Sequence, residues 1–198
     1  AGCIRSPPRH NQFFGVKAAQ ERIASREGGI IWHTQGSGKS LTMVWLAKWI
    51  RENQTDARVL IITDRTELDE QIEKVFGGVN EKVTRSRSGA ELITLLNQNQ
   101  PWLLCSLVHK FRGSDDDSSR DTDGNDFIKE LSSTIPTDFA AKGNLFVFVD
   151  EAHRTQSGKM HRAMKELLPD AMFIGFTGTP LLKADKMTSI ETFGSFIH

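Results

Sequence analysis

Five short apolar runs, rich in Ile, Val and Phe, recur along this chain and constrain its fold more than any other feature. None of them alternates polar with apolar residues, which is typical of strands buried on both faces of a parallel sheet. Between them, apolar side chains recur three and four residues apart, which is helical spacing. Strand–helix–strand order, repeated, predicts a three-layer αβα domain with a mostly parallel central sheet. The expected strands cover residues 29–33, 59–63, 102–106, 145–149 and 172–176, and the expected helices 39–52, 66–76, 89–98 and 158–168.

The composition fits one globular domain over residues 1–198. Apolar residues make up 38% of the chain and charged residues 25%. The chain is therefore too apolar to be disordered and too charged to be a membrane protein. No run approaches the roughly 18 apolar residues that a membrane span needs. The two cysteines, Cys3 and Cys105, form no disulfide framework or zinc motif. We therefore expect a buried, inert Cys105 and a reducing, cytoplasmic compartment.

The charges balance overall but are unevenly distributed. The chain has 25 basic and 25 acidic residues, which argues against binding that depends on bulk positive charge but not against a local phosphate site. Basic residues are in surplus over residues 1–60. Acidic residues collect in 113–126, a stretch rich in Ser, Asp and Gly that we expect to be a surface loop. A metal-binding role for this loop is the alternative, although its Asp residues lack the spacing of a calcium loop.

Residues 33–40, which read HTQGSGKS, directly follow an apolar run and precede an expected helix. This context is the one that a phosphate-binding loop requires, whereas the short pattern alone occurs by chance. Backbone N–H groups of such a loop converge on phosphate oxygens, with help from the helix N-terminus. Lys39 would reach the β- and γ-phosphates, and the Ser40 hydroxyl would bind Mg²⁺. His33 replaces the usual first glycine of the pattern. The expected nucleotide-binding residues of the loop are Thr34, Gln35, Gly36, Ser37, Gly38, Lys39 and Ser40.

A carboxylate pair, Asp150 and Glu151, immediately follows the apolar run 145–149. The carboxyl end of a parallel strand near a phosphate loop is where a second Mg²⁺-binding group is needed. We expect Asp150 to hold Mg²⁺ through water and Glu151 to act as general base on the attacking water. Taken alone, the pair could instead begin a helix as a cap. Together with the loop, it indicates hydrolysis of a nucleoside triphosphate.

Two threonines, Thr177 and Thr179, follow the last apolar run within the segment GFTGTP. Both hydroxyls are expected at the same edge of the sheet, close to the γ-phosphate. One interpretation is a sensor that couples the phosphate state to domain movement. The other is a tight turn whose geometry comes from glycine and proline.

Residues 33–40, 150–158 and 175–180 together resemble motifs I, II and III of superfamily 2 helicases and translocases. Further stretches narrow the resemblance to the motor (restriction) subunit of type I restriction-modification enzymes. These stretches are PRHNQFF at 8–14, TDRTELDEQ at 63–71, VHKF at 108–111 and Phe193-Gly194. The resemblance begins near Pro8 and covers nearly all of the chain. It implies a RecA-like domain of an ATP-driven translocase of double-stranded DNA, which works with specificity and methylation subunits.

The same resemblance implies roles for residues outside the loop and the carboxylate pair. Gln12 matches a glutamine that reads adenine, which its carboxamide can pair with in two hydrogen bonds; the alternative is a solvated residue. His153 matches a residue that couples motif II to motif III, and a structural histidine is the alternative. The expected DNA contacts are Arg65, His109 and Lys110. For Arg65, an Asp64–Arg65 pair that caps the following helix is equally compatible.

Other parts of such a motor are absent from this sequence. No arginine follows Pro180, and the nuclease signature of the family is not found. We therefore expect the first of two RecA-like domains, without the second domain or the nuclease. Such a chain would bind ATP weakly and hydrolyse little, because an arginine finger contributes ~10³–10⁵ in rate. The alternatives are another superfamily 2 motor, of the chromatin-remodelling or RNA helicase type, and a non-catalytic nucleotide-binding module.

Overall fold

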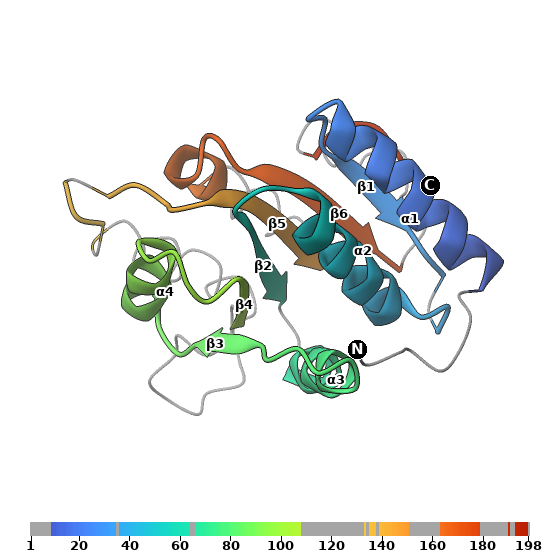
Figure 1. The fold of residues 1–198 in the computed structure, drawn as a ribbon, viewed down its shortest axis with the longest axis horizontal. Helices are drawn as coiled ribbons and strands as arrows, with labels where there is room; N and C mark the ends of the chain where they lie inside the picture. The colour runs from blue at the N-terminus through green and yellow to red at the C-terminus, as the bar shows by residue number, and fades with distance from the viewer. Residues whose placement is uncertain are drawn as a thin grey trace, which may run out of the picture.

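A parallel sheet of six strands forms the centre of the molecule (Figure 1). The computed structural model describes residues 9–34, 36–63, 66–107, 133, 135–137, 139–150, 163–178, 190 and 193–197. Within these ranges the strands are β1 (Gly29–Trp32), β2 (Ala57–Thr63), β3 (Thr84–Ser86), β4 (Leu103–Leu107), β5 (Asn144–Asp150) and β6 (Met172–Thr177). Their order in the sheet is β1-β6-β5-β2-β4-β3. Every pairing is parallel, so all the strands end at the same edge.

Helices cover both faces of this sheet. The helices are α1 (His10–Ala24), α2 (Lys39–Asn53), α3 (Thr66–Gly77) and α4 (Gly89–Leu96). In Figure 1, α1, α2 and α3 lie over one face, and apolar side chains of all three share a core cluster with Val59 of β2. The next residue, Leu60, packs with α4 and Met164 on the opposite face. The predicted three-layer αβα architecture is confirmed.

The five apolar runs correspond to β1, β2, β4, β5 and β6, whose residues are mostly buried. All five residues of β4 are buried, as are six of the seven in β5. Cys105 is buried in β4, as predicted. None of the helices in the described ranges is long and apolar enough to cross a membrane.

The apolar pattern does not predict the edge strand β3. Its three residues, Thr-Arg-Ser, form no apolar run and only Ser86 is buried, whereas three of the four residues of β1, at the other edge, are buried. Two other predictions concern segments that lie partly or wholly outside the described residues. The expected helix 158–168 is helical over 163–167, while 158–162 lie outside the described residues, as does the acidic stretch 113–126.

The strand-start edge of the sheet is organised around a buried arginine. Arg58 on β2 is 2% exposed. Its guanidinium donates hydrogen bonds to backbone carbonyls of four residues in three segments. The acceptors are Leu95 at 2.8 Å, Leu96 and Lys142 at 3.0 Å, and Pro101 at 3.1 Å. Because Leu95 and Leu96 end α4, Arg58 satisfies carbonyls that the helix leaves unpaired.

Candidate nucleotide-binding site

The glycine-rich loop connects the end of β1 to the start of α2, as its motif predicts. It turns where the Ser37 N–H donates to the Thr34 carbonyl at 3.0 Å. Gly36 and Gly38 have φ angles of 78° and 89°, in the left-handed region that glycine adopts without strain. Gly38 is also the N-cap of α2. The N-terminal turn of the helix therefore faces the end of the loop, which suits it to bind an anion.

The lysine of this loop contacts the carboxylate that follows the apolar run of β5. The Lys39 Nζ atom lies 2.6 Å from Asp150 Oδ1, and the two side chains are 16% and 0% exposed. β6 separates β1 from β5 in the sheet, so this contact joins two motifs that are distant in sequence. A carboxylate buried this deeply needs a partner charge, because removing it from water is costly.

The residues present at this point fit a magnesium ion. Ser40 follows Lys39 in α2 and is 4% exposed, and Asp150 is 3% exposed. Hydroxyl and carboxylate oxygens are ligands that Mg²⁺ prefers, and in nucleotide sites one or two of them suffice beside phosphate oxygens. Ser40 and Asp150 would hold the ion. When bound, Mg²⁺ would neutralise charge on the phosphates.

Gln12 connects α1 to the glycine-rich loop. Its side chain is buried, with the residue 2% exposed, so it is not a solvated surface residue. The amide Nε2 donates to the carbonyls of Ser37 at 2.9 Å and Gly38 at 3.2 Å. The Oε1 atom accepts from the Arg9 N–H at 2.8 Å, which caps the start of α1. One side chain thus fixes the helix N-terminus and the loop together.

His33, which replaces the first glycine of the loop motif, contacts two parts of the site. Its backbone N–H donates to the Thr177 carbonyl at 2.9 Å. Its ring Nδ1 lies 3.4 Å from the Ser37 hydroxyl, and both residues are buried. Thr177 itself is fully buried at the end of β6. A histidine in place of the first glycine of the motif is the sequence signal for these contacts.

Several predicted site residues lie outside the described ranges. They are Gln35, Arg65, His109, Lys110, Glu151, His153 and Thr179. Gln35 lies in the glycine-rich loop, and the other six follow strands that end at Thr63, Leu107, Asp150 and Thr177. Since the sheet is parallel, these strand ends share the edge that carries the Lys39–Asp150 contact.

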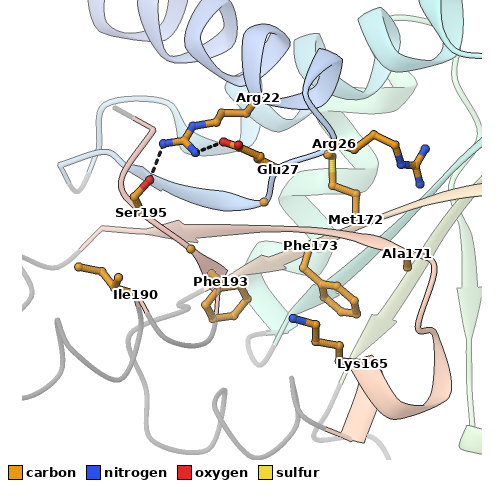
Figure 2. Close-up of a pocket in the computed structure, with 12 residues that line it drawn as sticks. Arg22, Arg26, Glu27, Lys165, Ala171, Met172, Phe173, Ile190, Phe193 and Ser195 are labelled. Carbon is orange, nitrogen blue, oxygen red and sulfur yellow. Dashed lines mark hydrogen bonds and ion pairs between the residues drawn. The ribbon is translucent and has the colours of Figure 1, made fainter.

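A separate basic cavity of about 620 Å³ lies at the opposite edge, where β1 and β6 begin. Figure 2 shows Arg22 between Glu27 and Ser195, with hydrogen bonds to both. Lys165 lines the same cavity and extends toward Phe193. The sheet lies between this cavity and the glycine-rich loop, so the cavity is no part of the candidate nucleotide site.

Comparison with known families identifies the class of protein that carries this site. The model of the family described as SWI2/SNF2 ATPase matches residues 11–198. The chain belongs to the SWI2/SNF2 ATPase family. Membership of an ATPase family implies that this SWI2/SNF2 chain binds a nucleotide, in agreement with the loop and its lysine.

Relatives of this SWI2/SNF2 chain include subunits of restriction enzymes. The type I restriction enzyme HindI endonuclease subunit of Haemophilus influenzae is 30% identical, over 98% of this chain and 19% of the relative. A type I restriction endonuclease subunit of Staphylococcus aureus is 29% identical, over 96% of this chain and 20% of the relative. The predicted resemblance to type I motor subunits is confirmed over nearly the whole chain. The chain spans about a fifth of the length of these relatives.

The fold agrees with that of a solved SWI2/SNF2 core. The SWI2/SNF2 ATPase core of Sulfolobus solfataricus, solved in complex with double-stranded DNA, superposes with a TM-score of 0.63 at 18% identity. The match covers 96% of this chain and 36% of that one. The predicted RecA-like fold is therefore confirmed.

Proposed function

We propose that this chain is the ATP-binding and ATP-hydrolysing motor domain of a type I restriction enzyme, in which it drives translocation of double-stranded DNA. The observation that carries the proposal is the 2.6 Å contact between Lys39 of the glycine-rich loop and Asp150. Nucleotide-hydrolysing sites need these two groups close together, one for the phosphates and one for Mg²⁺. The relatives in restriction enzymes support the biological setting.

Each residue of the site has a distinct task in this proposal. Lys39 leaves Asp150 and binds the β- and γ-phosphates when ATP·Mg²⁺ enters. Ser40 and Asp150 hold the Mg²⁺. Glu151, the next residue, orients the attacking water and accepts its proton. His153, Thr177 and Thr179 relay the state of the γ-phosphate to the rest of the motor.

The DNA and protein partners follow from the same proposal. Arg65, His109 and Lys110 contact the DNA backbone, beyond the ends of β2 and β4. A second RecA-like domain completes the nucleotide site, and specificity and methylation subunits choose the DNA site. Double-stranded DNA bound to the Sulfolobus core supports the choice of nucleic acid.

The experiment that tests this proposal compares nucleic acids as activators. The ATPase rate of the intact subunit is measured without nucleic acid, with duplex DNA and with duplex RNA. We expect duplex DNA to stimulate hydrolysis far more than RNA. Equal stimulation by RNA would favour a motor of the RNA helicase type. No hydrolysis under any condition would instead favour a non-catalytic nucleotide-binding module.

Replacing Gln12 by Ala is expected to weaken ATP binding and to lower the preference for ATP over GTP. In the structure the amide of Gln12 is engaged by Ser37, Gly38 and Arg9, so pairing with adenine requires it to exchange these partners. A bidentate pairing of this kind discriminates between bases by about 1–3 kcal/mol, roughly tenfold or more in affinity. Displacement of a fluorescent nucleotide by ATP and by GTP measures both constants.

The isosteric variant Gln12→Glu is the matched control for this prediction. It keeps the size of the side chain but cannot donate to the two loop carbonyls. It is expected to weaken binding of both nucleotides. An unchanged ratio of ATP to GTP affinity in Gln12→Ala would remove adenine recognition from this residue.

A further inference from the structure

A second basic cavity lies beside the edge strand β3, far from the glycine-rich loop along the sheet. It has a volume of about 400 Å³, and its lining includes Lys82, Arg85, Arg87 and Leu107. Three of the eight residues that line it are cationic. No motif in the sequence assigns a role to the three cations, which lie between the expected helix 66–76 and the expected helix 89–98.

Two of the three cations, Lys82 and Arg87, are exposed, and neither forms an ion pair within the part of the chain that the structure describes. Arg85 pairs with Glu73 at 3.0 Å, with side chains 31% and 61% exposed. An exposed pair of this kind contributes little and is readily exchanged for another anion.

The acidic residue closest in sequence to Arg87 is already engaged by the backbone. Glu91 Oε2 accepts a hydrogen bond from the Arg87 N–H at 2.6 Å, while the Glu91 N–H donates to the Ser88 hydroxyl at 3.1 Å. The Ser88 side chain caps the start of α4, and Glu91 binds the backbone of Arg87, the residue before this N-cap. The Glu91 carboxylate is therefore engaged by backbone, and it forms no ion pair with the Arg87 guanidinium among the described residues.

The cavity runs along β3, from Lys82 before the strand begins to Arg87 directly after it ends, and so reaches the edge of the sheet where the strands end. Leu107, which lines the cavity, is the last residue of β4, and the predicted DNA contacts His109 and Lys110 follow it in sequence. β4 lies between β3 and β2, and the predicted contact Arg65 follows the end of β2. Two strand spacings separate β2 from β3, about 10 Å. That distance corresponds to about three nucleotides of B-DNA at ~3.4 Å each.

We propose that Lys82, Arg85 and Arg87 bind phosphates of the DNA backbone and extend the DNA track to the β3 edge. The inference rests on the proposed function, because it assumes that DNA lies across the strand ends. Cations on long, exposed side chains suit phosphates and carry no base recognition. The site therefore contributes affinity and register on the DNA without sequence preference.

The test removes two charges from this cavity and two from the cavity at the opposite edge. The double variant Lys82→Ala/Arg87→Ala is compared with Arg26→Ala/Lys165→Ala, which has the same net charge. Affinity of the intact protein for a labelled non-specific DNA duplex is measured by anisotropy over a series of KCl concentrations. ATP binding is measured for each variant, and Arg87→Lys tests whether charge alone suffices.

We expect Lys82→Ala/Arg87→Ala to lower the slope of log affinity against log salt by about two, since each phosphate contact contributes about 0.9. Affinity near physiological salt falls by about tenfold or more, while ATP binding stays unchanged and Arg87→Lys retains most of the slope. The Arg26→Ala/Lys165→Ala control keeps the slope of the unsubstituted protein. Equal slopes in the two double variants would overturn the inference and leave the proposed function standing. Failure of the unsubstituted protein to bind duplex DNA would overturn both.

Discussion

Replacing Lys39 by Ala is expected to lower the ATPase rate by roughly 10²–10³-fold, the loss that follows removal of one preorganised group that stabilises transition-state charge. Lys39 is placed for this task by the first turn of α2, where its Nζ atom lies 2.6 Å from Asp150. ATP affinity is also expected to fall, because the same ammonium contacts the phosphates before and during hydrolysis. Steady-state ATPase assays and nucleotide titration measure the two effects.

The contrasting variant is Glu151→Gln. It removes the general base but leaves Lys39, Ser40 and Asp150 in place, so we expect ATP binding to persist while hydrolysis is lost. Loss of a general base costs about 10²–10⁴-fold in rate. A Lys39→Ala rate equal to that of the unsubstituted protein would contradict the role of the loop. Unchanged hydrolysis in Glu151→Gln would place the base elsewhere.

Replacing Arg58 by Ala is expected to lower the free energy of unfolding by about 3–5 kcal/mol. This is a large part of the total, which is roughly 5–15 kcal/mol for a typical domain. The variant removes four hydrogen bonds to carbonyls and leaves those acceptors buried. Burial lowers the pKa of the Arg58 guanidinium below its ordinary value, yet it remains charged at neutral pH. Urea denaturation gives the free energy of unfolding, and we expect the Tm to fall by roughly 10 °C.

Two further variants test the origin of this effect. Arg58→Lys keeps the charge but has no planar fork of donors, so it should recover part of the lost free energy and not all of it. Arg26→Ala removes an exposed arginine whose hydrogen bonds are long, at 3.2 and 3.4 Å, and should cost less than about 0.5 kcal/mol. Equal losses for Arg26→Ala and Arg58→Ala would exclude the carbonyl network as the cause.

Five of the strands were predictable from the sequence, and β3 was not. Runs such as 145–149 are recognisable because both faces of β5 are buried. Thr84–Ser86 carries no such signal, because only Ser86 of its three residues is buried. The hydrogen bonds of Arg58 could not be predicted from the sequence either. They depend on carbonyls from three segments that come together only in the folded chain.

The loop and the carboxylate could be predicted because each is a local pattern with a physical reason. Lys39 follows glycines whose φ angles require them, and Asp150 ends a buried strand. The partners of Gln12 and His33 could not be predicted in the same way. Gln12 contacts Ser37, which is 25 residues away in sequence, and His33 contacts Thr177 in a neighbouring strand. No periodic pattern of residues in the sequence predicts contacts of this kind.

The order of the strands has a mechanical consequence. β1, which leads to the nucleotide loop, and β3, which carries the basic cavity, are separated by four strands, about 24 Å across the sheet. In the proposed function, ATP and the DNA phosphates at β3 would therefore not touch. Between the two sites, β5 and β2 pair from Ala57 to Ile62 in unbroken register. Coupling of ATP hydrolysis to DNA movement, as proposed, would then act across the sheet and not through direct contact.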